Sequence, residues 1–196
     1  MRITRQVEVG QSPTEVWALF GDIPQVAACL PGTRLTGQES ETRYTGEVVI
    51  SAGPVRMEFD GTADILSRDD TARTMQVEAS GADRRGRGQA SLLLDAAVAP
   101  AARGSIVDVA LDLTLSGAAA QYGRGMVADI TAVLLDQFAR NLQSRLTAIE
   151  QGLDPDDVDA SAPASGLSFA LRATRLALLR VFRRFFLPYR PQPTGR

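Results

Sequence analysis

Residues 125–151 read GMVADITAVLLDQFARNLQSRLTAIEQ, and this stretch decides the fold. Its apolar residues recur every three or four positions, which is the period of an amphipathic α-helix: Val127, Ile130, Leu134, Phe138, Leu142, Leu146 and Ile149. The pattern predicts a single helix of about seven turns, far longer than the average helix of a globular protein. Gly152 comes next and can end this helix.

The sequence before the helix alternates apolar and polar residues from 34 to 116. This period of two predicts antiparallel strands with one covered face and one wet face. A first strand is expected in RITRQVEVG at 2–10, and the later strands are expected at 42–52, 55–66, 73–79, 90–98 and 105–115. Hairpin turns are predicted at 52–54 and 67–72, and an Arg- and Gly-rich turn or bulge at 82–89.

Two short helices are predicted between the first strand and this run of strands. Ser12 can cap a helix at 13–20, with Pro13 at its first position and Glu15 completing a capping box. A second helix starts near Pro24 and is stopped by Pro31 and Gly32.

These elements predict an α+β helix-grip fold, in which a curved antiparallel sheet wraps around one long C-terminal helix. A helix longer than the sheet is wide forces the sheet to curl, and the two short helices can close one mouth of the resulting groove. Two interpretations of the interior stay open: an apolar ligand pocket or a solid core. The candidate pocket residues are Phe20, Leu30, Met57, Phe59, Met75, Val77, Tyr122, Met126, Ile130 and Leu134.

Charge is distributed unevenly along the 196 residues, whose net charge is −2. Residues 167–196 hold seven of the 21 basic residues and no acid, which leaves 14 basic against 23 acidic residues, or −9, in residues 1–166. A body this acidic argues against a nucleic-acid-binding protein. The N-terminal sequence shows no apolar segment of a signal peptide, and a single cysteine, Cys29, suits a reducing compartment. We therefore expect a cytoplasmic location.

Catalytic and metal-binding residues are scarce in this composition. The chain has no histidine, the commonest general base, and one cysteine cannot form a thiolate metal site. Asp60, Asp64, Asp108 and Asp112 alternate along strands, which is typical of a solvated face. We predict a protein that is not an enzyme, with no metal site and no covalent cofactor. Cys29 is expected to be a buried residue near the pocket mouth.

The sequence after residue 151 predicts three separate segments. Residues 152–166 are acidic and rich in Pro, Ser and Gly, as in a flexible linker, residues 167–188 form a basic amphipathic helix, and residues 189–196 are expected to be disordered. Arginines on one face and Phe and Leu on the other suit a helix lying on an anionic membrane, although packing on the domain or docking to a partner protein are alternatives. The residues expected to bind the membrane are Arg172, Leu178, Arg180, Phe182, Arg183, Arg184, Phe185 and Phe186.

Several segments resemble the G-subunit family of carbon monoxide dehydrogenase, within the START-like (SRPBCC) lipid-binding superfamily. They are PTEVWALFGDIPQVAACLPG (13–32), YTGEVVISAGPVRMEFDGTADI (44–65), GRGQAS (86–91) and QYGRGMVADI (121–130), and the resemblance covers about residues 1–150. It implies a helix-grip domain over residues 1–151 with a hydrophobic cavity. It also implies an accessory role beside a molybdenum hydroxylase of the carbon monoxide dehydrogenase type, with a respiratory quinone as the apolar ligand.

We therefore expect a hydrophobic-ligand carrier that is peripheral on the inner face of the cell membrane. Its expected partners are an anionic leaflet, the dehydrogenase and an isoprenoid quinone, which would be bound but not covalent. Two alternatives remain: a ligand-free recruitment or maturation adaptor for the dehydrogenase, and a cyclase-like enzyme of the same superfamily.

Overall fold

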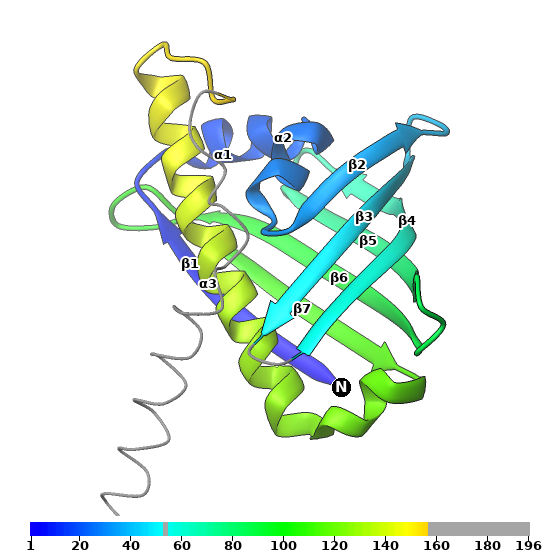
Figure 1. Cartoon of the computed structure of the whole chain (residues 1–196). Helices are drawn as coiled ribbons and strands as arrows, with labels where there is room; N and C mark the ends of the chain where they lie inside the picture. The colour runs from blue at the N-terminus through cyan, green and yellow to red at the C-terminus, as the bar shows by residue number, and fades with distance from the viewer. Residues whose placement is uncertain (53–54, 157–196) are drawn as a thin grey trace, which may run out of the picture.

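The computed structural model describes residues 1–52 and 55–156. Within them, seven strands form one antiparallel sheet, and a long helix lies across its inner side (Figure 1). The elements in chain order are β1 (Arg2–Val9), α1 (Pro13–Phe20), α2 (Ile23–Cys29), β2 (Thr33–Gln38), β3 (Arg43–Ala52), β4 (Val55–Asp69), β5 (Thr74–Asp83), β6 (Gln89–Pro100), β7 (Ser105–Leu115), the 3₁₀ helix η1 (Gly117–Tyr122) and α3 (Gly123–Glu150).

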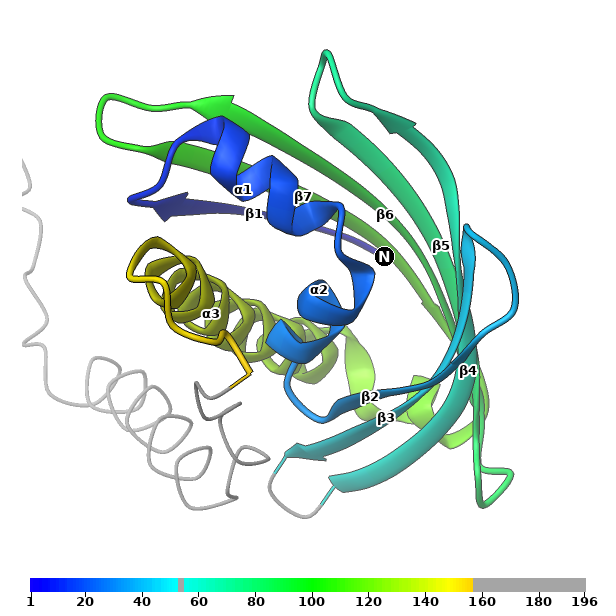
Figure 2. The ribbon, with the colours of Figure 1, turned by 90° about the horizontal axis from the view of Figure 1, so that it is seen from above.

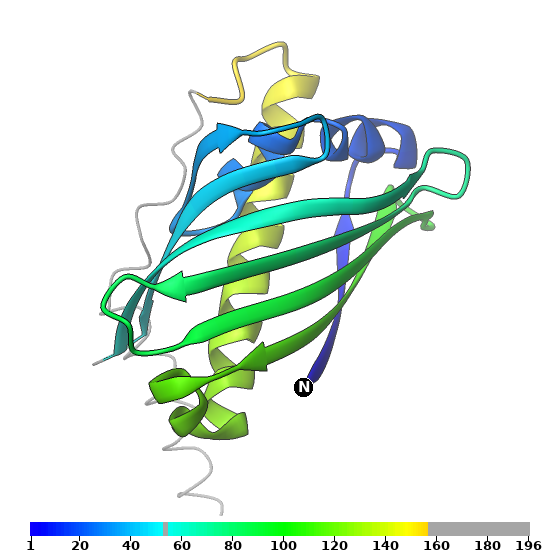
Figure 3. The ribbon, with the colours of Figure 1, turned by 90° about the vertical axis from the view of Figure 1, so that its right-hand side faces the viewer.

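The sheet has the order β1-β7-β6-β5-β4-β3-β2, so the first strand pairs with the last and β1 and β2 form the edges. Figure 2 shows the sheet curling from β1 round to β3, with α3 beside β1 and α2 between α3 and the β2–β3 side. The side view in Figure 3 shows α3 running behind the strands. The predicted α+β helix-grip architecture is confirmed.

The strands follow the predicted alternation, with one correction near the β4–β5 turn. The pairing register shifts between Ile65 and Ser67, and β4 continues to Asp69 instead of turning at 67. This bulge leaves Leu66 half-exposed and turns Arg68 to the inner face, opposite the buried Met75. The predicted turn at 67–72 was therefore placed too early, because a local bulge changes which side chains face inward.

Both short helices form where local signals predicted them. Ser12 and Glu15 make the reciprocal capping box of α1, in which the Ser12 backbone N–H donates to the Glu15 carboxylate over 2.8 Å. The side chain of Asp22 accepts a hydrogen bond from the Gln25 backbone N–H over 3.1 Å at the start of α2.

The long helix α3 has 28 residues and is about 42 Å long. Gly152, with a φ of +69°, ends it in the left-handed region, where the absence of a Cβ avoids strain. Ile149 was predicted on its buried face but is 48% exposed.

Several predictions lie outside the described residues. They concern the linker beyond Asp156, the tail helix at 167–188 with its eight predicted membrane-binding residues, and the segment 189–196.

Candidate functional site

The buried residues of the inner face form two hydrophobic clusters. Cluster 1 lies between α1, the C-terminal half of α3, β1, β6 and β7, and includes Val16, Val107, Leu142 and Leu146. Cluster 2 is smaller and consists of the buried Met57, Phe59 and Ala119, with partly buried residues such as Tyr122 packed against it.

A zone of half-buried apolar residues separates the two clusters, and we call it the central zone. On the sheet it contains Val48, Ala63, Ala79 and Leu113, and on α3 it contains Val127, Ile130, Val133 and Leu134. Ala63 and Ala79 are register partners, so small side chains meet in the middle of the inner face. The backbone of α3 makes its contacts mainly with α1, α2, β1 and η1 and does not close over β3–β5. Apolar side chains that point inward therefore stay partly accessible.

The ten predicted pocket residues are divided among these regions. Phe20, Met75 and Val77 belong to cluster 1 or pack against it, whereas Met57, Phe59 and Tyr122 belong to cluster 2 or pack against it. Ile130 and Leu134 lie in the central zone. Leu30 at the end of α2 and Met126 near the start of α3 are 39% and 46% exposed. The ten residues are thus distributed over cluster 1, cluster 2, the central zone and two exposed positions.

An arginine from the β4–β5 hairpin fixes α1. The guanidinium carbon of Arg68 lies 4.6 Å from the centroid of the Trp17 ring, and its Nη1 donates to the Phe20 carbonyl over 3.1 Å. Asp70 accepts hydrogen bonds from Arg68 Nε and from Trp17 Nε1, each over 2.8 Å. The Arg68 contact, and to a lesser extent Trp17, lowers the pKa of Asp70. The covering helix is therefore held by a polar arrangement that the sequence did not reveal.

Polar side chains of α3 hold α2. Asn141 Nδ2 donates to the Cys29 carbonyl over 2.9 Å, and Arg145 Nη1 donates to Gln25 Oε1 and, over 3.0 Å, to Asp156 Oδ1. Arg145 is only 3% exposed, on the same helix face as Leu142, so a charge inside the apolar stripe was a usable signal. Cys29 is fully buried, as predicted, and burial raises the pKa of its thiol to about 11.

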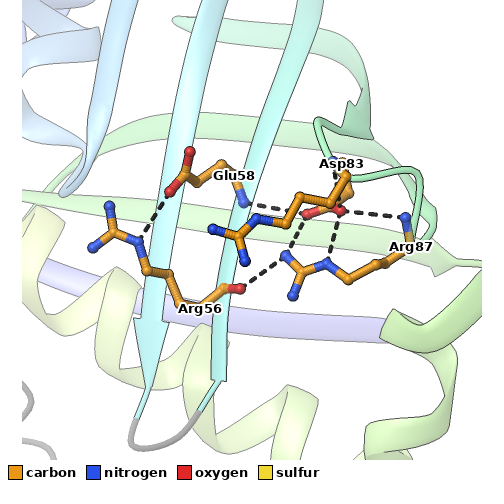
Figure 4. Close-up of polar contacts among 5 residues, drawn as sticks. Arg56, Glu58, Asp83 and Arg87 are labelled. Carbon is orange, nitrogen blue, oxygen red and sulfur yellow. Dashed lines mark hydrogen bonds and ion pairs between the residues drawn. The ribbon is translucent and has the colours of Figure 1, made fainter.

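A buried carboxylate organises the turn after β5, as Figure 4 shows. The side chain of Asp83 is inaccessible to solvent and accepts from Arg87 Nη2 over 2.7 Å and from Arg87 Nε over 2.9 Å. Three backbone N–H groups, of Glu58, Arg85 and Arg87, also donate to it. The Arg87 hydrogen bonds hold the pKa of Asp83 well below its ordinary range.

Arg87 donates a hydrogen bond to a β4 carbonyl that has no pairing partner in β5. Pairing between β4 and β5 begins at Phe59 and Asp83, so Arg56 lies beyond the end of β5. Arg87 Nη2 donates to the Arg56 carbonyl over 2.9 Å, and the Arg87 carbonyl accepts from Ala118 in η1 over 2.6 Å. This clamp, formed by Asp83 and Arg87, joins β4 to η1 at the cluster 2 end. The four-residue spacing of Asp83 and Arg87 could have indicated it.

Two shallow hollows, of about 520 and 580 Å³, lie on the outer face of the sheet. They share Asp60, Gly61 and Thr62, and their other walls are mainly hydroxyl and charged side chains. Arg84 pairs there with Glu47 and, over 2.7 Å, with Asp60. Hydrogen bonds from Arg34 and then Arg84 lower the pKa of Glu47. These hollows lie on the opposite face of the sheet from the predicted pocket.

Within residues 1–52 and 55–156, no group of three or more His, Cys, Asp or Glu side chains is arranged to hold a metal ion. The helices in the same ranges include none long and apolar enough to cross a bilayer.

A profile of the carbon monoxide dehydrogenase G-subunit (CoxG) family matches residues 6–147. The chain belongs to this family. The match confirms the resemblance seen in the sequence, and the CoxG family is one of accessory, generally non-catalytic subunits of carbon monoxide dehydrogenase. No curated protein matches the chain significantly in sequence.

Solved structures similar to this CoxG family member share its fold. A conserved protein from Geobacillus kaustophilus has a TM-score of 0.68 at 16% identity, over 75% of this chain and 95% of that chain. A START superfamily protein from Mycobacterium smegmatis has a TM-score of 0.54 at 14% identity, over 76% and 98%. A protein from Thermus thermophilus has a TM-score of 0.54 at 16% identity, over 76% and 97%. At these identities the similarity establishes the START-like fold alone.

Proposed function

We propose that this protein is a non-enzymatic carrier that binds an isoprenoid quinone in the central zone and serves a molybdenum hydroxylase of the carbon monoxide dehydrogenase type. The observation that carries the proposal is the incomplete burial of inward-facing apolar residues between the two clusters. A folded chain that leaves Ile130 and Leu134 partly accessible gains stability when an apolar ligand covers them. Family membership supports the dehydrogenase as partner.

The far end of the central zone suits the head group of such a ligand. Tyr122 is the last residue of η1 and packs against cluster 2, which places its phenol at this end of the inner face. A quinone carbonyl can accept a hydrogen bond from a phenol, while the isoprenoid chain needs only apolar contacts. The head group would therefore lie toward η1 and the chain toward α2.

Membrane association completes the proposal and rests on the sequence of the tail. The tail carries seven arginines and no acid, whereas residues 1–166 carry −9 and would be repelled by an anionic leaflet. The tail would hold the carrier at the inner face of the cell membrane, where isoprenoid quinones are dissolved.

The test is quinone transfer from vesicles. Full-length protein is incubated with anionic vesicles that contain an isoprenoid quinone and is then separated from them, extracted with organic solvent and analysed by mass spectrometry. Ile130→Trp fills the central zone and should lower the bound quinone at least about fivefold, corresponding to roughly 1 kcal/mol. Ile149→Trp is the matched control, because Ile149 is exposed at the other end of the same helix. Equal uptake by both variants, or no uptake by the wild type, would exclude this site.

A ligand-free adaptor is the second candidate function. It is favoured by the position of the two described hollows on the outer face and not on the inner one. In that case the wild type would bind the dehydrogenase while carrying no extractable lipid.

A further inference from the structure

Apolar and polar contacts together hold α2. Of its seven residues, Ala27 and Cys29 are buried, and Ile23 and Val26 are partly buried against cluster 1. The two buried side chains are small, so polar contacts add to a modest apolar contribution. The polar side chains Asn141 and Arg145 of α3, 9% and 3% exposed, supply the remaining attachment.

The attachment through Arg145 is asymmetric in burial. The Arg145 side chain is 4% exposed, whereas that of its ion-pair partner Asp156 is 69% exposed. One oxygen of Asp156 accepts from Arg145 over 3.0 Å and from Gln25 Nε2 over 3.3 Å. A single surface carboxylate therefore connects α2, α3 and the chain beyond the end of α3.

Asp156 lies in the chain between α3 and the basic tail, so the tail is joined to this contact. Asp156 follows the end of α3 by six residues and immediately precedes the segment that leads to the basic tail. A force on the tail therefore reaches Asp156 before it reaches any residue of the sheet.

We propose that Arg145, Gln25 and Asp156 form a latch that keeps α2 closed over the central zone, and that the tail opens it by drawing Asp156 away when it engages an anionic membrane. This inference rests on the membrane part of the proposed function. Without Asp156, Arg145 is a buried cation that has lost its anionic partner among the described residues. Its long side chain then turns its guanidinium toward water and leaves Gln25 without its donor. The consequence is a loosened α2 and an open path to the central zone at the membrane surface.

The experiment measures hydrogen exchange of the amides in residues 22–30 of the full-length protein, with and without vesicles of phosphatidylglycerol and phosphatidylcholine. Asp156→Asn keeps the size of the side chain and removes its charge. Asp136→Asn is the matched control, because it likewise removes the charge of one exposed acid, but from the middle of α3. We expect exchange in α2 to be at least threefold faster in Asp156→Asn than in Asp136→Asn. Vesicles should increase the rate of hydrogen exchange in α2 of the wild type and change it little in Asp156→Asn.

Equal α2 exchange in the two variants would overturn the latch. So would a wild-type α2 that does not respond to vesicles, because the tail would then have no influence on it. Failure of the proposed carrier function gives a different result: α2 still responds to vesicles and to Asp156→Asn, but no variant takes up quinone.

Discussion

Cluster 1 and cluster 2 lie at opposite ends of the inner face and are held together differently. Cluster 1 is enclosed by α1 and α3 against β1, β6 and β7, and residues such as Val16 and Leu142 are completely buried. Cluster 2 has three buried members, and the Asp83–Arg87 clamp replaces a neighbouring strand beside it. One end is therefore stabilised mainly by apolar packing, whereas at the other an ion pair between the buried Asp83 and the partly exposed Arg87 connects β4 to η1. The central zone, where we propose that the ligand binds, lies between them.

The largest loss of stability is expected for a substitution in cluster 1. Leu142→Ala removes a side chain that is 0% exposed and should lower the free energy of unfolding by roughly 3–5 kcal/mol, because the cavity it leaves cannot collapse. Chemical denaturation measures this change. Leu153→Ala, at a position that is 57% exposed, is the control and should change the stability little. A loss of less than about 1 kcal/mol for Leu142→Ala would contradict the assignment of cluster 1 as the main core.

A smaller, more local effect is expected from the clamp. Asp83→Asn removes the charge that pairs with Arg87 and leaves an amide that cannot accept all of the same hydrogen bonds. We expect a lower thermal midpoint and faster hydrogen exchange in η1 and the first turns of α3, while the C-terminal half of α3 keeps its protection. Uniform loss of protection along α3 would mean that the two ends are not independent.

The same variant has a defined pH dependence. Because the pKa of Asp83 is lower in the folded protein than in the unfolded chain, its stabilising contribution is complete above about pH 4. It is lost as the pH falls from there through the lowered pKa. The stability difference between wild type and Asp83→Asn should therefore be constant at about pH 5–7 and shrink below about pH 4. Other paired acids, such as Asp60 and Glu47, are present in both proteins and cancel from this difference.

The smallest loss of stability is expected for a substitution in the central zone. Leu134→Ala should lower the free energy of unfolding of the ligand-free protein by only about 1 kcal/mol, because this partly buried side chain has fewer contacts to lose than Leu142. Comparison of the two leucine variants by chemical denaturation tests the interpretation of the interior directly. Equal losses for Leu134→Ala and Leu142→Ala would identify the inner face as one solid core and remove the basis for a groove.

Local patterns predicted most of the elements. The three- and four-residue spacing of residues 125–151 located α3 to within two residues at its start and one at its end. The capping residues Ser12 and Glu15 located α1 at its observed bounds. Such signals depend only on residues a few positions apart in the sequence, so they can be recognised before the fold is known. The bulge after Ile65 was missed because the strand pattern alone does not show it; in the folded chain it accompanies the contact of Arg68 with Trp17, 51 positions away.

The candidate site was only partly predictable for the same reason. Periodicity identifies which residues face inward, and it correctly placed Met75, which is buried in cluster 1. It does not determine how closely α3 approaches β3–β5, and that distance decides whether an inward residue is buried or accessible. Leu30 and Met126 were predicted as pocket residues and are 39% and 46% exposed; Leu30 follows the end of α2, and Met126 lies in the first turn of α3.

The sequence by itself determined the order of the elements, the inner faces of the strands, the length of α3 and the charge contrast between body and tail, since each depends on composition or on short-range periodicity. The family followed from the resemblance of four segments, and the profile match over residues 6–147 confirmed it. Only the tertiary structure decided which polar residues are buried, which partners they contact and where the apolar packing stops. Arg145 and Asp156 are 11 positions apart, and Arg87 and the Arg56 carbonyl are 31 positions apart. Their contacts exist because the curled sheet and the long helix bring distant backbone segments together, and a buried charge is stable only where such a partner is within hydrogen-bonding distance.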